Sequence, residues 1–116
     1  MWEIEFYETH TGRCPVQDFI DDLDPKGQAK VLWVVDLLQK YGPRLGMPYA
    51  KHIGGELWEL RIKMASNQYR IIYFLFTGKV FVLLHGFAKK TSAIPRRDLE
   101  IARERYKDFS RRRSES

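Results

Sequence analysis

The sequence predicts an α+β fold: an N-terminal strand, a helical hairpin, an antiparallel three-strand meander that joins the same sheet, and a basic C-terminal helix. Three observations predict it. Apolar and polar residues alternate at the N-terminus, apolar residues recur with helical spacing in two segments that begin at Pro15 and Pro25, and three apolar runs follow residue 56. A chain of 116 residues suits one domain, which we place at residues 1–110.

The first elements are a strand and two helices. Trp2, Ile4 and Phe6 alternate with polar residues, which predicts a strand at residues 2–7 with one buried face. Pro15 can begin a short helix, and an apolar stripe follows it at helical spacing, formed by Val16, Phe19, Ile20 and Leu23. Asp24 is a good N-cap for a second helix, which Gly42-Pro43 ends and whose stripe is Val31, Val34, Val35, Leu38 and Tyr41.

The rest of the chain is expected to form a loop, the meander and a helix. Residues 43–56 hold two prolines and three glycines and are expected to be a loop, and strands are expected at 57–63, 69–76 and 79–88. The last two strands are apolar on both faces, so we expect them inside the sheet. A helix from Pro95 has an apolar stripe of Leu99, Ala102, Tyr106 and Phe109, and residues 111–116 are expected to fray.

Charge is distributed unevenly along the chain. Residues 1–24 hold seven acids and one base, whereas the remainder holds 19 bases and eight acids. Such a positive region attracts polyanions, and nucleic acid is the leading candidate partner; the alternative is that the bases only keep a small protein soluble. No run of about 18 apolar residues or secretory signal is present, and Cys14 is the only cysteine, so we expect a cytoplasmic protein without a membrane segment or disulfide.

Candidate functional residues lie on the meander strands. Glu59, Arg61 and Lys63 share one face of the first strand, and Arg70 begins the second. The third strand ends in the run 85–91, which carries His85, Lys89, Lys90 and Thr91. We expect these cations to converge near one end of the sheet. The alternative for each arginine is a structural ion pair, such as one between Arg61 and Glu59.

Missing residue types narrow the chemistry. A two-metal nuclease needs several carboxylates, yet the meander strands supply only Glu56 and Glu59. Gly54-Gly55 precedes a strand, whereas glycine-rich phosphate loops precede a helix. Cys14 stands before a helix-starting proline, where a thiol pKa can be lowered, but an incidental thiol is the favoured interpretation. We therefore expect a basic site that uses no metal and no cofactor.

RNA offers a reaction for such a site, because its 2′-hydroxyl can attack the adjacent phosphate. Arg61 and Arg70 suit phosphate stabilisation, since a guanidinium stays charged and binds two oxygens. His85 is the natural proton-transfer candidate, although alternation along residues 81, 83, 85 and 87 places it on an apolar face, where a structural role is equally expected. Lys89 or Lys90 can transfer a proton only if its pKa is lowered, and otherwise contacts phosphate.

Three segments of the sequence, GELWELR at 55–61, YRIIYF at 69–74 and LLHGFAKKT at 83–91, resemble the phage-derived HigB-like branch of the RelE/ParE toxin superfamily. The resemblance covers nearly the whole chain. It implies ribosome-dependent cleavage of mRNA in the decoding site, leaving a 2′,3′-cyclic phosphate or its hydrolysis product. It also implies a partner antitoxin that carries a helix-turn-helix domain, as HigA-like antitoxins do.

The resemblance also assigns residues. Arg70 matches the arginine that opens the middle strand, Arg61 the arginine of the first motif, and Lys89 and Lys90 the basic pair after the last strand. With His85, these form the expected catalytic set, and the expected RNA contacts are Glu59, Lys63 and Thr91; Glu59 is also a possible base or ion-pair partner. Several superfamily members use a tyrosine near the chain end, whereas Tyr106 lies on the expected buried stripe, so the acid and base stay open.

A second function also fits the charge. A non-catalytic module that binds RNA or the ribosome needs the same basic surface and no chemistry. Primer extension on translated mRNA distinguishes the two, because only the endoribonuclease creates new 5′ ends.

Overall fold

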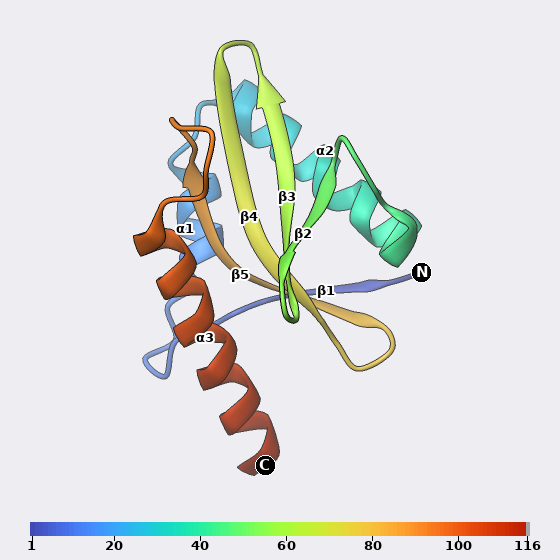
Figure 1. Ribbon diagram of the computed structural model, residues 1–116, viewed down its shortest axis with the longest axis vertical. Coiled ribbons are helices and arrows are strands. Elements are labelled where there is room, and N and C mark those ends of the chain that lie inside the picture. Colours follow the sequence, from blue (N-terminus) through green and yellow to red (C-terminus); the bar gives the residue numbers. More distant parts are fainter. Residues whose placement is uncertain (116) are drawn as a thin grey trace.

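The computed structural model describes residues 1–115 as one five-stranded sheet with helices on both of its faces (Figure 1). The strands are β1 (Glu3–Phe6), β2 (Ala50–Gly54), β3 (Leu57–Met64), β4 (Asn67–Phe76) and β5 (Val80–Ala88), in the spatial order β1-β5-β4-β3-β2. β1 runs parallel to β5, and the other neighbours are antiparallel. The α+β class is confirmed, as is the interior position of the two most apolar strands, β4 and β5.

The helices begin where the sequence indicates. α1 spans Pro15–Asp21 and α2 spans Pro25–Tyr41, and the short 3-10 helix η1 (Gly42–Arg44) follows at the predicted stop. The carboxylate of Asp24 caps α2, because its Oδ1 accepts a hydrogen bond from the Gly27 N–H at 2.7 Å. α3 spans Arg96–Glu115. In the described part of the chain, no helix has both the length and the apolar run needed to cross a membrane.

Two segments differ from the sequence-based expectation. Part of the expected loop 43–56 is β2, which pairs with β3 so that Lys51 lies opposite Glu59. Glycines and prolines around this short strand conceal its sequence pattern. Pairing with β3 is what makes the segment a strand. The expected frayed tail continues α3 as far as Glu115, where Arg112 donates to Asp108 and to the Glu8 carbonyl. Residue 116 lies outside the described residues.

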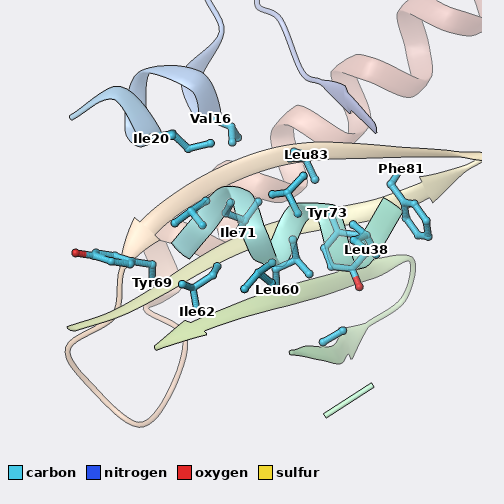
Figure 2. Packing of buried hydrophobic residues seen from close by; sticks show 14 of the residues in the cluster. Val16, Ile20, Leu38, Leu60, Ile62, Tyr69, Ile71, Tyr73, Phe81 and Leu83 are labelled. Carbon is cyan, nitrogen blue, oxygen red and sulfur yellow. The ribbon is translucent and has the colours of Figure 1, made fainter. Parts of the chain in front are cut away.

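Each face of the sheet has its own apolar core. α1 and α2 cover one face, where Val16 and Ile20 of α1 pack against β3, β4 and β5 together with four residues of the α2 stripe, Val31, Val34, Val35 and Leu38 (Figure 2). The prediction was wrong for Tyr41, which lies at the end of α2 and is 47% exposed. α3 packs against β5 on the opposite face, with Ala102 and Phe109 over Ile72, Phe74, Val82 and Leu84. Because α3 lies over β5, the same face of β2 and β3 is available to the charged side chains described below.

A β-bulge reverses the predicted orientation of His85. The register between β4 and β5 shifts after Ile72, so that Leu84 is an extra residue and His85 lies opposite Ile72, on the α3 side. Strict alternation with Phe81 and Leu83 would have placed His85 on the α1–α2 side. That expectation is wrong, because one inserted residue exchanges the faces of the positions that follow it.

A substitution at Gly86 can test how closely α1 packs against β5. A Cβ at Gly86 would lie 2.5 Å from Cδ2 of Phe19, whereas one at Gly78 would meet no atom within 4 Å. We therefore expect Gly86→Ala to lower the free energy of unfolding by about 1–3 kcal/mol through overpacking, and Gly78→Ala to change it by less than about 0.5 kcal/mol. Urea denaturation measures both, and equal midpoints for the two variants would contradict the close packing of α1 on β5.

Candidate functional site

Strand register brings the predicted charged residues of β3 and β4 together. Arg61 lies directly opposite Arg70, and Glu59 lies opposite Ile72, two positions along the same face. β2 adds Lys51, which is opposite Glu59. The sequence-based prediction missed Lys51 because it fell in the expected loop. The run from Ala50 to Ile53 has two adjacent polar residues and lacks the alternation that indicates a strand. We call the set Lys51, Glu59, Arg61, Arg70 and Lys89 the charged cluster.

A buried ion pair lies at the centre of the charged cluster. Glu59 and Arg70 are only 2% and 3% exposed, and Oε1 of Glu59 lies 3.3 Å from Nε of Arg70. The second carboxylate oxygen, Oε2, lies 4.0 Å from Nε of Arg61, whose side chain is 27% exposed. Glu59 therefore faces both guanidinium groups, and the predicted ion-pair alternative for Glu59 and Arg61 describes this contact.

Arg70 is held on several sides. Its Nη1 donates to the Tyr69 carbonyl at 3.1 Å and its Nη2 donates to Oε1 of Gln68 at 3.0 Å. Burial lowers the pKa of Arg70, but an arginine remains protonated in proteins. A fixed positive charge therefore lies beneath the surface, while Arg61 is the more accessible of the two arginines.

A hollow of about 640 Å³ opens beside the ion pair. Its wall has three accessible cations, Arg61, Lys89 and Lys90. The rest of the lining comes from the β3–β4 turn and the ends of the neighbouring strands, and consists of Ser66, Asn67, Gln68, Arg70, Ala88, Thr91 and Ser92. The expected convergence of Arg61, Arg70, Lys89 and Lys90 at one end of the sheet is thus present. Lys63 lies on a neighbouring hollow that shares Arg61, Gln68 and Arg70 with this one.

Lys89 has an unusual electrostatic environment. Burial lowers its pKa, the positive charge of Arg70 lowers it further, and the carboxylate of Glu59 opposes both. Arg61 and Lys51 also lower the pKa of Lys89. Its backbone N–H donates to the Gln68 carbonyl at 2.7 Å, which fixes the chain at the mouth of the hollow. Lys89 thus meets the condition stated for a lysine that transfers protons, a lowered pKa caused by nearby cations and desolvation.

His85 is bound to α3. One ring nitrogen, Nε2, lies 2.7 Å from Oδ1 of Asp98, and the other, Nδ1, lies 3.2 Å from Nη1 of Arg105. Arg105 has no lone pair to accept with, so Nδ1 accepts and Nε2 carries the proton donated to Asp98. Burial lowers the pKa of His85, while the hydrogen bond to Asp98 opposes this shift. The ring also stacks on Phe87, and its charged neighbours differ from those of Lys89.

Two other candidates lie apart from the charged cluster. Tyr106 packs edge-on against Phe74 in the core beneath α3, with ring centroids 4.7 Å apart. Cys14 is a free thiol whose pKa is raised by burial, so a reactive thiolate is not favoured there. Within residues 1–114, no group of three or more His, Cys, Asp or Glu side chains is arranged to hold a metal ion.

The ion pair gives a testable asymmetry in stability. Glu59→Gln leaves the buried guanidinium of Arg70 without its counter-charge, so we expect it to lower the free energy of unfolding by about 3–5 kcal/mol. Arg61→Gln removes a partly exposed partner 4.0 Å away and should cost about 1 kcal/mol or less. Glu59→Asp, which keeps the charge, should fall between them. Equal urea midpoints for wild type and Glu59→Gln would contradict a central role for this carboxylate.

His85 gives a testable pH dependence of stability. Because its folded pKa is lowered, the unfolded chain takes up a proton near pH 6.5 that the folded chain does not. The unfolding free energy should therefore fall from pH 7.5 to pH 5.5, and fall less in His85→Gln. Asp108, whose pKa is lowered mainly by its hydrogen bond from Tyr7, changes the free energy of unfolding only below about pH 4. Identical pH slopes for the two proteins in urea titrations would rule out this contribution of His85.

The charged cluster lies within a segment that matches a known protein family. A family model described as "Phage derived protein Gp49-like (DUF891)" matches residues 18–107, which include every residue of the charged cluster. No curated protein gives a significant match to the chain. Members of this family are RelE/ParE-like toxins and are associated with toxin–antitoxin systems. The chain belongs to the phage-derived Gp49-like family of RelE/ParE-like toxins.

Proposed function

We propose that the chain is the toxin of a type II toxin–antitoxin system, in the HigB-like branch, and that it cuts mRNA in the decoding site of the ribosome. The observation that carries this proposal is the charged cluster. Four cations, Lys51, Arg61, Arg70 and Lys89, surround one buried carboxylate beside an open hollow. An excess of positive charge at an accessible surface suits a phosphodiester that gains negative charge during cleavage.

The reaction needs only the RNA and the protein. The 2′-oxygen forms a bond to the adjacent phosphorus while its proton passes to a base. The bond from phosphorus to the 5′-oxygen breaks, and that oxygen takes a proton, which leaves a 2′,3′-cyclic phosphate and a 5′-hydroxyl. In this proposal Arg61 binds the phosphate oxygens directly, whereas Arg70 acts from its buried position by maintaining positive potential at the hollow.

Proton transfer is assigned to Lys89 in this proposal. Lys89 lines the hollow and has a lowered pKa, so a neutral amine is more accessible there than on an ordinary surface lysine. His85 is engaged by Asp98 and Arg105 at both ring nitrogens and serves to hold α3. Lys90, Thr91 and Lys63 remain candidate RNA contacts at the rims of the hollows, while buried Glu59 positions the arginines.

The partners follow from the same proposal. Toxins of such systems are held by an antitoxin, and we propose a HigA-like one with a helix-turn-helix domain. Ribosome-bound mRNA as substrate places the protein in the cytoplasm. A neighbouring open reading frame that encodes a small helix-turn-helix protein would support this assignment, and co-purification of the two proteins would test it directly.

Cleavage of translated mRNA tests the proposed chemistry. Arg61→Gln and Lys89→Ala should each lower the cleavage rate at least about 100-fold, because each removes a charge or a proton-transfer group at the reacting phosphate. Lys89→Arg should be as impaired as Lys89→Ala, since a guanidinium does not deprotonate. Primer extension on an mRNA with purified ribosomes measures these rates, and exposed Lys26→Gln on α2 is the matched control.

Two outcomes would overturn the proposal. Full cleavage by Arg61→Gln and Lys89→Ala would show that the charged cluster is not the site. Binding of wild-type protein to ribosomes or RNA without new 5′ ends would favour the alternative function, a non-catalytic RNA- or ribosome-binding module.

A further inference from the structure

The outer face of α3 carries a line of bases that the charged cluster does not include. Arg96, Arg103, Lys107 and Arg111 are seven, four and four positions apart, which places them on one side of a helix. All four are exposed. At 1.5 Å per residue, they extend over about 22 Å. We call these four residues the α3 stripe.

A different side of α3 is committed to the core. Leu99, Ala102, Tyr106 and Phe109 pack towards the sheet, and the α3 stripe is centred about 115° around the helix from them. At its two ends, Arg96 pairs with Glu100 at 3.0 Å and Arg111 pairs with Asp108 at 2.9 Å. Among residues 1–114, Arg103 and Lys107 form no ion pair within 4.0 Å, although Glu100 and Glu104 precede them by three residues. The cations in the middle of the stripe are therefore available to a phosphate.

Helix stability does not account for this pattern. Cations stabilise the C-terminal end of a helix and destabilise its N-terminal end, each by a few tenths of a kcal/mol or more. Arg96 and Arg97 nevertheless begin α3, where the helix dipole disfavours them. The ion pair with Glu100 offsets part of this cost at Arg96, whereas Arg103 and Lys107, in the middle of the helix, gain from neither effect.

The α3 stripe continues the basic wall of the hollow. Lys89 and Lys90 are followed by the short loop 91–95, and α3 begins at Arg96. The hydroxyl of Thr91 donates to the Ala93 carbonyl at 2.8 Å within this loop. From there α3 runs away from the loop towards the far end of the molecule (Figure 1). A strand that leaves the hollow across the loop therefore meets the stripe along its length.

We propose that the α3 stripe is a second RNA-binding surface, which holds the phosphate backbone of the substrate strand beyond the cleaved phosphate. The inference rests on the proposed function, because it takes the strand in the hollow to be RNA. Contacts of this kind neutralise phosphates, depend on salt and carry no sequence preference. The stripe supplies affinity and orientation, whereas the charged cluster supplies the chemistry.

RNA length and salt distinguish this surface from the hollow. The probes are fluorescein-labelled oligouridylates of 6 and 18 nucleotides, bound to the full chain at several salt concentrations. Arg103→Gln/Lys107→Gln should remove most of the affinity advantage of the longer strand and reduce the slope of log K against log salt by about 1.4, at roughly 0.7 per lost contact. Lys26→Gln/Lys79→Gln removes the same charge from exposed positions elsewhere and should leave both quantities unchanged.

The outcomes separate this inference from the proposed function. An unchanged length advantage and salt slope in Arg103→Gln/Lys107→Gln would overturn the stripe as an RNA surface. If this variant binds the 18-nucleotide strand as tightly as the wild type but binds ribosomes more weakly, the stripe contacts ribosomal RNA. That result would also overturn the stripe as a surface for the substrate strand. Length-dependent binding by a wild-type protein that never cuts mRNA would contradict the proposed function alone. Matching thermal midpoints for wild type and variant would establish that the fold is retained.

Discussion

The ion pair between Glu59 and Arg70 is the constraint on which the open side of the sheet depends. Register places Arg61 and Arg70 directly opposite each other, an arrangement that disfavours strand pairing by like-charge repulsion. A carboxylate 3.3 Å from one guanidinium and 4.0 Å from the other offsets that repulsion. Oε1 of Glu59 and Nε of Arg70 face each other as an ion pair without forming a hydrogen bond. A buried pair of this kind contributes little net stability, which favours a role in shaping the site.

The same ion pair makes the cations of the charged cluster differ in their accessibility. Burial fixes Arg70, so its charge acts at a distance, and the more exposed Arg61 and Lys89 remain available to a ligand. One carboxylate cannot neutralise four neighbouring cations, and the excess charge contributes to the lowered pKa of Lys89. A lysine with a lowered pKa beside an arginine that stays protonated is the combination on which the proposed proton transfer rests.

Local patterns predicted most of the fold, and long-range pairing accounts for what they missed. Asp24 with Pro25 and the apolar runs of β4 and β5 each specify their own element, so these were predicted from short windows. β2 and its Lys51 depend on β3 as a partner, and glycines and prolines around them conceal the strand. The orientation of His85 depends on one extra residue in β5, which no alternation rule can reveal.

The contacts of His85 connect the two basic surfaces, the charged cluster and the α3 stripe. Turned towards α3 by the bulge, His85 contacts Asp98 in the first turn of the helix and Arg105 two turns later, and Arg105 also donates to the Leu84 carbonyl at 2.9 Å. These contacts attach α3 to β5, which ends at Ala88, immediately before Lys89. The half-buried His85 thus contributes, together with the apolar core beneath α3, to the position of the α3 stripe relative to the hollow, a structural contact that its place beside the basic run alone would not have indicated.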